Sequence, residues 1–163
     1  MKRTILILTA CLMLVQSVTA NENPIEVGSV NWGRNLDQAL KVSGETGQPV
    51  FVLFQEVPGC SGCQQFGKTV LTHPQIVQAI ETEFLPVLVY NNISGNDRRL
   101  LDRFGEPAWN FQVVRFLNAT GNDIIPRKDR VWTVGELAER MVETLKVSGR
   151  PVPEYLRELT ENF

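Results

Sequence analysis

Histidine and cysteine are scarce in this chain, which has one histidine and three cysteines among its 163 residues. A structural zinc site needs four side-chain ligands, so beyond the cysteines and His73 it would have to recruit carboxylates. A c-type haem attachment site needs histidine directly after the second cysteine of C-x-x-C, and Gln64 stands there instead. The sequence therefore argues against a zinc site and excludes an attached haem.

The chain also lacks an excess of basic residues and a long apolar segment after residue 20. The chain has 16 basic and 18 acidic residues, a formal net charge of −2, whereas nucleic-acid binders carry a clustered basic surface. After residue 20 no apolar stretch reaches the ~20 residues that a spanning helix needs. What is present, 43% hydrophobic and 21% charged residues, is typical of one soluble globular domain.

The first twenty residues have the pattern of an export signal. Lys2 and Arg3 are followed by an almost wholly apolar stretch from Ile5 to Val15, and small residues end at Ala20. This order is typical of a secretory signal peptide cleaved after Ala20. The apolar stretch is too short for a membrane span, which argues against an uncleaved anchor.

Cys11 allows one alternative, because Leu8-Thr9-Ala10-Cys11 resembles a bacterial lipobox. Apolar residues continue after Cys11, which disfavours lipidation. We therefore predict a signal peptide at 1–20 and a single domain at 21–163, without a stable membrane anchor and led by a mobile polar stretch. Losing two basic residues changes the formal charge from −2 to −4.

Apolar runs and helical periodicity alternate along the domain. Continuous apolar runs predict buried strands, and apolar residues at helical spacing predict amphipathic helices. We expect strands at 50–54, 84–90, 113–117 and, after a turn, 123–125; we expect helices at 35–43, 61–71, 74–83, 97–104, 134–145 and 154–160. Helices that alternate with buried strands predict an α/β fold, and the hairpin makes its central sheet mixed.

The chemistry lies in Cys60-Ser61-Gly62-Cys63, which follows a buried strand and opens a helix. A helix N-terminus favours the thiolate of Cys60, the species that attacks disulfides. Cys63, one turn further along, can attack the resulting mixed disulfide. So short a loop is a poor structural staple. The pattern predicts a redox-active pair, while a structural disulfide and a Cu(I) site on two soft thiolates stay open.

With these residues the chain resembles the thioredoxin-like superfamily over 32–149. The strand at 50–54, Cys60 to Cys63, the strand at 85–89 and the hairpin after Val113 carry the resemblance. It is most similar to exported bacterial members with a Val-Pro-Gly-Cys-x-x-Cys site. The resemblance implies a thioredoxin-like fold, a central mixed sheet flanked by helices on both faces.

The same resemblance implies a thiol–disulfide oxidoreductase that exchanges disulfides with exported proteins and with a redox partner protein. Cys60 would be its nucleophile and Cys63 its resolving thiol. Neither a bound cofactor nor a metal is implied, and the location would be the periplasm. Two other functions stay open: Cu(I) binding or delivery through the same thiols, and a thioredoxin-like binding module that does not cycle.

The substrate-binding side is also implied by the resemblance. Thioredoxins place a cis-proline at the start of the strand before the hairpin, facing the dithiol. Here that place falls at Phe111 and Gln112, and Pro107 comes several residues too early. We therefore take Trp109, Phe111 and Gln112 as candidate substrate-binding residues. Because this loop lacks the cis-proline that keeps metals away from the thiolates in the family, metal binding becomes a stronger alternative.

Five further residues can be interpreted from their positions in the sequence. Leu53 stands where thioredoxins bury an acid, and Glu56 is the nearest carboxylate that could move a proton for Cys63. We interpret Glu56 as a solvated loop charge and His73 as a helix-start residue before Pro74. Trp32 and Trp132 are interpreted as packing residues.

Overall fold

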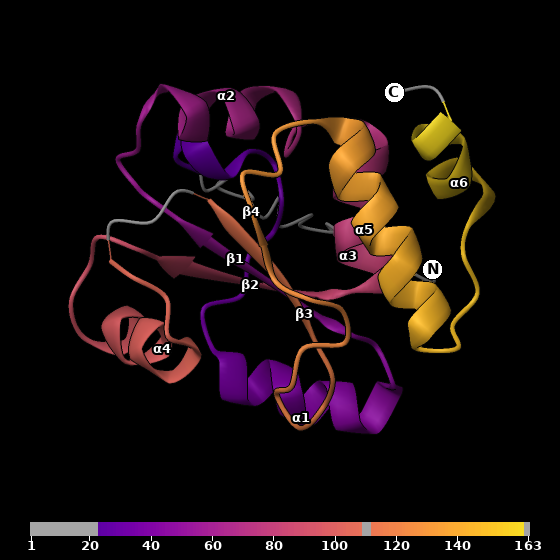
Figure 1. Cartoon of the computed structure of the whole chain (residues 1–163), viewed down its shortest axis with the longest axis horizontal. Helices are drawn as coiled ribbons and strands as arrows, with labels where there is room; N and C mark the ends of the chain where they lie inside the picture. Colours follow the sequence, from indigo (N-terminus) through magenta and orange to yellow (C-terminus); the bar gives the residue numbers. More distant parts are fainter. Residues whose placement is uncertain (1–22, 109–111, 162–163) are drawn as a thin grey trace, which may run out of the picture.

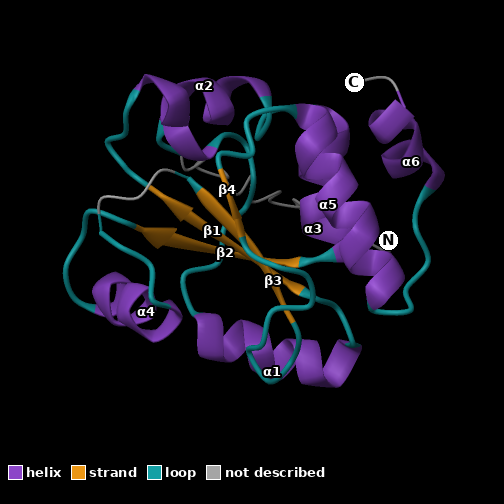
Figure 2. Cartoon of the chain, in the orientation of Figure 1, coloured by secondary structure: helices purple, strands orange, loops and turns teal. Residues whose placement is uncertain are grey.

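The central sheet has four strands and is mixed (Figures 1 and 2). The structure is a computed structural model that describes residues 23–108 and 112–161. The strands are β1 (Val50–Gln55), β2 (Leu85–Tyr90), β3 (Val113–Leu117) and β4 (Lys128–Asp129). Their order is β2-β1-β3-β4, with β1 parallel to β2 and antiparallel to β3, and β4 antiparallel to β3. The predicted mixed sheet is confirmed.

Helices cover both faces of this sheet, as the sequence predicted. The helical elements are η1 (Ile25–Val27), α1 (Leu36–Thr46), α2 (Ser61–Thr69), α3 (Pro74–Glu83), α4 (Asn96–Phe104), α5 (Val134–Val147) and α6 (Glu154–Glu161). Helices α1 and α4 lie on one face, and α2, α3, α5 and α6 lie on the other (Figure 1). None of the helices in the described part of the chain combines the length and the hydropathy that crossing a bilayer requires.

The period-two geometry of β1 divides the core between the two faces. Phe51 and Leu53 belong to the cluster under α3 and α5, whereas Val50, Val52 and Phe54 belong to the cluster under α1 and α4. All five side chains are fully buried, and each contributes roughly 1.5–3 kcal/mol of burial free energy. The strand before the dithiol is therefore anchored from both sides.

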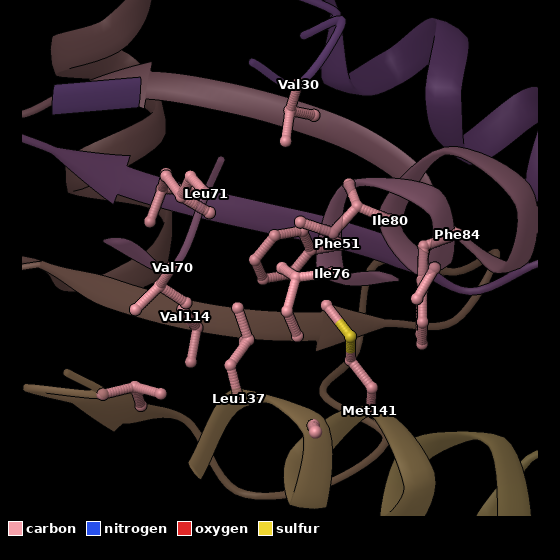
Figure 3. Packing of buried hydrophobic residues seen from close by; sticks show 14 of the residues in the cluster. Val30, Phe51, Val70, Leu71, Ile76, Ile80, Phe84, Val114, Leu137 and Met141 are labelled. Atoms are coloured by element: carbon pink, nitrogen blue, oxygen red, sulfur yellow. The ribbon is translucent and has the colours of Figure 1, made fainter. Parts of the chain in front are cut away.

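The larger cluster packs around Phe51. Its ring stacks on that of Phe116 with 5.1 Å between centroids. Figure 3 shows Ile76 close to this ring, while Leu137 and Met141 point from α5 toward the sheet. The strand that leads to the cysteines is thus packed tightly against the core.

Short-range signals account for several helix ends. The predicted capping box is present, because Thr133 Oγ1 accepts the Glu136 N–H at 3.1 Å and Glu136 Oε2 accepts the Thr133 N–H at 3.1 Å. His73 is the N-cap of α3 and Pro74 its first residue, so the expected place of His73 is confirmed.

The returning strand was predicted at 123–125, and that position was wrong. Only an isolated bridge joins Leu117 to Asp123, and the returning strand is found at Lys128–Asp129. The Ile124 N–H still donates to the Phe116 carbonyl at 2.8 Å, but Pro126 follows soon after and has no N–H to continue the ladder. Of the polar lead at 21–26 that was expected to be mobile, residues 21 and 22 lie outside the described residues, and Asn23 donates to the carbonyls of Gly28 and Val30 at 3.0 and 2.9 Å.

Candidate active site

The two cysteines lie where β1 passes into α2, beyond the carboxyl end of the strand. Cys60 is the N-cap of α2 and is exposed, whereas Cys63 lies in the first turn of the helix and is fully buried. Both are free thiols, and their Sγ atoms are 3.4 Å apart. A disulfide has about 2.05 Å between its sulfurs, so only a small movement separates this arrangement from a bonded pair.

The position at the helix N-terminus lowers the pKa of Cys60. Its largest cause is a hydrogen bond from the backbone N–H of Cys63, which outweighs burial of the Cys60 sulfur. The side chain of Cys63 and the N–H of Gly62 lower the pKa further, while the charge of Glu56 raises it. Backbone donors at the first turn of α2 thus favour the thiolate at the exposed cysteine.

Burial acts in the opposite direction on the second cysteine. It raises the pKa of Cys63 to about 12, and the hydrogen bond with Cys60 adds to this effect. Cys63 therefore stays protonated near neutral pH. The pair is asymmetric, with one exposed sulfur that ionises readily and one buried sulfur that does not.

The loop before Cys60 has little free space. The Val57–Pro58 peptide bond is cis, and the Val57 N–H donates to Asn92 Oδ1 at 3.3 Å. A Cβ atom on Gly59 would lie 2.4 Å from the Glu56 carbonyl oxygen and 2.7 Å from the Cys63 Cβ. Glycine is therefore required at 59 for the loop to approach α2 this closely.

Glu56 does not lie in open solvent as the sequence analysis interpreted it. One of its carboxylate oxygens and the sulfurs of Cys60 and Cys63 all lie within 4.8 Å of one another, and the side chain is partly buried. Thiolates are soft ligands and a carboxylate is a hard one. These three residues could together hold a metal ion, and the charge of the carboxylate raises the pKa of Cys60.

Two buried polar residues at this site escaped the sequence analysis. Glu26 Oε1 accepts the Gly59 N–H at 2.9 Å, and the Glu26 side chain is almost fully buried. Gln55 donates from Nε2 to the carbonyls of Glu26 and Cys63 at 2.8 and 3.3 Å. No local signal reveals Glu26, because it is 33 residues from its partner.

The candidate substrate side is placed only in part. Trp109 and Phe111 lie outside the described residues, so their substrate-binding role stays a prediction. Gln112 is fully buried, and its side chain donates to the Val131 carbonyl at 2.5 Å and accepts the Val131 N–H at 3.0 Å. The Gln112 amide group is thus occupied inside the protein, and its backbone carbonyl accepts the Arg130 N–H at 3.0 Å. The substrate-binding role of Gln112 stays a prediction.

Trp132 does more than fill the core. Its ring meets Phe66 edge-on with 6.2 Å between centroids, in agreement with packing. A Cβ on Gly62 would lie 3.5 Å from Trp132 Cη2, so the indole also flanks the turn between the cysteines. Trp32 packs as expected, 5.7 Å from the Phe51 ring.

An exposed cysteine at a helix N-terminus, a buried cysteine one turn later and a mixed sheet behind them define a dithiol protein of α/β architecture. A family model described as thioredoxin-like matches residues 31–119. The chain belongs to the thioredoxin-like family, which confirms the resemblance of the sequence. No curated protein matches the chain.

Solved structures agree on the fold. A thioredoxin from Thermus thermophilus has a TM-score of 0.61 at 21% identity, and covers 74% of this chain and 91% of its own. A structure named DsbH oxidoreductase has 0.58 at 16% identity, with 86% of this chain and 95% of its own covered. A putative disulphide-isomerase from Bacteroides thetaiotaomicron has 0.54 at 15% identity, covering 76% and 96%. At these identities the likeness shows the thioredoxin-like fold alone.

Proposed function

We propose that the protein is a thiol–disulfide oxidoreductase that acts on cysteines of exported proteins, with Cys60 as nucleophile and Cys63 as resolving thiol. One observation carries the proposal: an exposed thiol whose pKa is lowered lies 3.4 Å from a buried thiol that stays protonated. Disulfide exchange through a dithiol needs one thiolate that attacks the substrate and a second thiol that later resolves the mixed disulfide. Membership of the thioredoxin-like family supports the same conclusion.

In the reductive direction, the Cys60 thiolate attacks one sulfur of a substrate disulfide. A bond forms between Cys60 Sγ and that sulfur, and the other substrate sulfur leaves as a thiolate that takes up a proton. Cys63 then loses its proton to solvent and attacks Cys60 Sγ, which breaks the mixed disulfide and releases the second substrate sulfur as a thiolate. Two electrons pass to the substrate, and Cys60–Cys63 becomes a disulfide.

The oxidative direction is the same sequence reversed, with the protein disulfide accepting two electrons from a substrate dithiol. A redox partner protein must restore the starting state in either direction, by supplying a dithiol or a disulfide. The pattern at 1–20 supports export, and the periplasm is the compartment we propose, where such a pair can be oxidised.

The test is the redox equilibrium of the pair. Purified protein is equilibrated in buffers of reduced and oxidised glutathione, and mass spectrometry measures the fraction of free Cys60 and Cys63. We expect a reversible two-electron transition between about −270 and −120 mV, the range of related dithiol proteins. Cys60→Ser should abolish insulin reduction, and Cys63→Ser should accumulate a mixed disulfide on Cys60. A pair that stays locked in one state would contradict the proposal.

Cu(I) binding is the second candidate, because Glu56, Cys60 and Cys63 bring three ligand atoms within 4.8 Å of one another. Thiolates favour Cu(I) over harder ions. Titration of the reduced protein with Cu(I) against a competing chelator decides between the two functions. Stoichiometric uptake without disulfide reductase activity would favour metal handling, and reductase activity without tight uptake would favour the oxidoreductase.

A further inference from the structure

A buried glutamate contacts the loop before the dithiol, and it comes from a segment of the chain that the family model does not match. The family model begins at residue 31, and η1 precedes it. Glu26 of η1 is only 4% exposed, yet it accepts a hydrogen bond from Gly59, the residue directly before the nucleophile. Burying a carboxylate is unfavourable unless it is hydrogen-bonded. The bond to Gly59 is therefore a specific feature of this site.

The rest of η1 is fastened to the same helix. A Cβ on Gly67 of α2 would lie 1.9 Å from the Ile25 carbonyl oxygen, so the two backbones touch where glycine leaves room. Gln55 bridges the carbonyls of Glu26 and Cys63, at 2.8 and 3.3 Å. The segment around Glu26 thus makes two contacts with this region, one with Gly59 in the loop before α2 and one with Gly67 inside α2.

We propose that Glu26 is a positioning residue of the proposed oxidoreductase, whose carboxylate holds the Gly59 N–H and so keeps Cys60 at the N-cap of α2. The inference rests on the proposed function. It assigns a redox role to a segment that the family model does not include. Glu26 acts through the loop and does not touch the reacting sulfurs.

The physical reason lies in the backbone donors that stabilise the Cys60 thiolate. They are the N–H groups of Cys63 and Gly62, and they act over hydrogen-bond distances. If Gly59 is released, the loop can turn and carry the Cys60 sulfur away from these donors. The thiolate then loses stability, and with it the reduced state of the pair. The disulfide becomes favoured, and the reduction potential falls.

The decisive experiment compares three variants of the full chain. Glu26→Met keeps the length of the side chain but has no acceptor for Gly59. Glu26→Gln keeps an acceptor oxygen and loses only the charge. Glu81→Met is the control, because Glu81 of α3 also accepts hydrogen bonds from the segment before α1, from the N–H and the side chain of Asn31 at 2.8 and 2.9 Å.

The readout is the equilibrium constant with glutathione, together with the rate at which iodoacetamide alkylates Cys60 at neutral pH. We expect Glu26→Met to shift the equilibrium about tenfold toward the disulfide, which corresponds to 29.6 mV, and to slow alkylation. Glu26→Gln should stay within about twofold of the wild type, and Glu81→Met should match it. Circular dichroism confirms that each variant is folded.

Three results would overturn the inference. Glu26→Met could leave the potential unchanged, Glu26→Gln could shift it as far as Glu26→Met, or Glu81→Met could shift it equally. If Glu26→Met does not fold, Glu26→Asp takes its place, because its carboxylate is one methylene too short for the bond. If the wild-type pair does not cycle, the proposed function itself fails. That result differs from a failure of the inference on Glu26, because it is obtained on the wild type before any variant is made.

Discussion

Two glutamates are buried to nearly the same extent, and their partners are quite different. Glu26 is 4% exposed and Glu106 is 6% exposed. Glu26 accepts a backbone N–H beside the dithiol, whereas Glu106 binds the guanidinium groups of Arg115 and Arg127 at distances of 2.7 to 3.1 Å. The partner of a buried carboxylate, and not its depth of burial, therefore decides whether that carboxylate contacts the site or the scaffold.

The Glu106 cluster ties the segment after α4 to the sheet. Arg115 of β3 also donates to Asp123 at 2.5 Å and to the Phe104 carbonyl at 3.1 Å. Burial alone would raise the pKa of Glu106, but hydrogen bonds from Arg127 and Arg115 outweigh it and lower the pKa. These charges hold each other in place, and the partners given above belong to the sheet and to the segments beside it.

The largest effect should come from breaking this scaffold cluster. Glu106→Ala leaves Arg115 buried without its main counter-charge, which typically costs about 3–5 kcal/mol. We expect the free energy of unfolding, measured by urea denaturation at pH 7, to fall by that amount. The potential of the cysteine pair should stay within about 10 mV in the folded protein. A shift in potential as large as that of Glu26→Met would show that the two regions are not independent.

The same cluster predicts how stability depends on pH. The pKa of Glu106 is lower in the folded state than its ordinary value of 4.5. Its contribution is therefore complete above pH 4.5 and is lost as the pH falls through the folded pKa. The stability difference between the wild type and Glu106→Ala should shrink as the pH is lowered from 5 to 3, and a difference that grew would contradict this sign.

The next effect concerns the two sulfurs. Because the pKa of Cys60 is lowered and that of Cys63 is about 12, iodoacetamide should alkylate Cys60 more than about a hundredfold faster at pH 7. The rate at Cys60 should rise with pH and level off below the pH at which an ordinary cysteine does. Peptide mapping by mass spectrometry separates the two sites, and equal labelling would remove the asymmetry on which the mechanism depends.

The smallest effect should come from the charge of Glu56. This charge raises the pKa of Cys60, so Glu56→Gln should lower that pKa and shift the alkylation profile to lower pH. At neutral pH the rate should rise by less than about tenfold, since Coulomb effects near the surface are modest. Glu45→Gln, an exposed substitution on α1, is the control, and a profile unmoved by Glu56→Gln would place that carboxylate outside the site.

Elements whose causes are local were predictable. The apolar runs gave β1 to β3 within a residue or two, and the capping box at Thr133 gave the start of α5. The C-x-x-C pattern, set between a buried strand and a helix, located both cysteines of the candidate site. The returning strand was misplaced because Pro126, which has no N–H, separates the bridge at Asp123 from the paired residues Lys128 and Asp129.

The class of fold and the two reactive cysteines could be predicted from the chain, since hydrophobic period, capping and cysteine spacing act over a few residues. The burial of Cys63 and the contact with a distant segment follow only from tertiary packing. Packing brought Glu26 to Gly59 across 33 residues and buried Cys63, whereas Glu56 is close to both thiols along the chain itself. The contact of Glu26 with Gly59 forms only when η1 packs onto α2, and the close approach at Gly67 that permits this packing leaves no periodic pattern in the sequence.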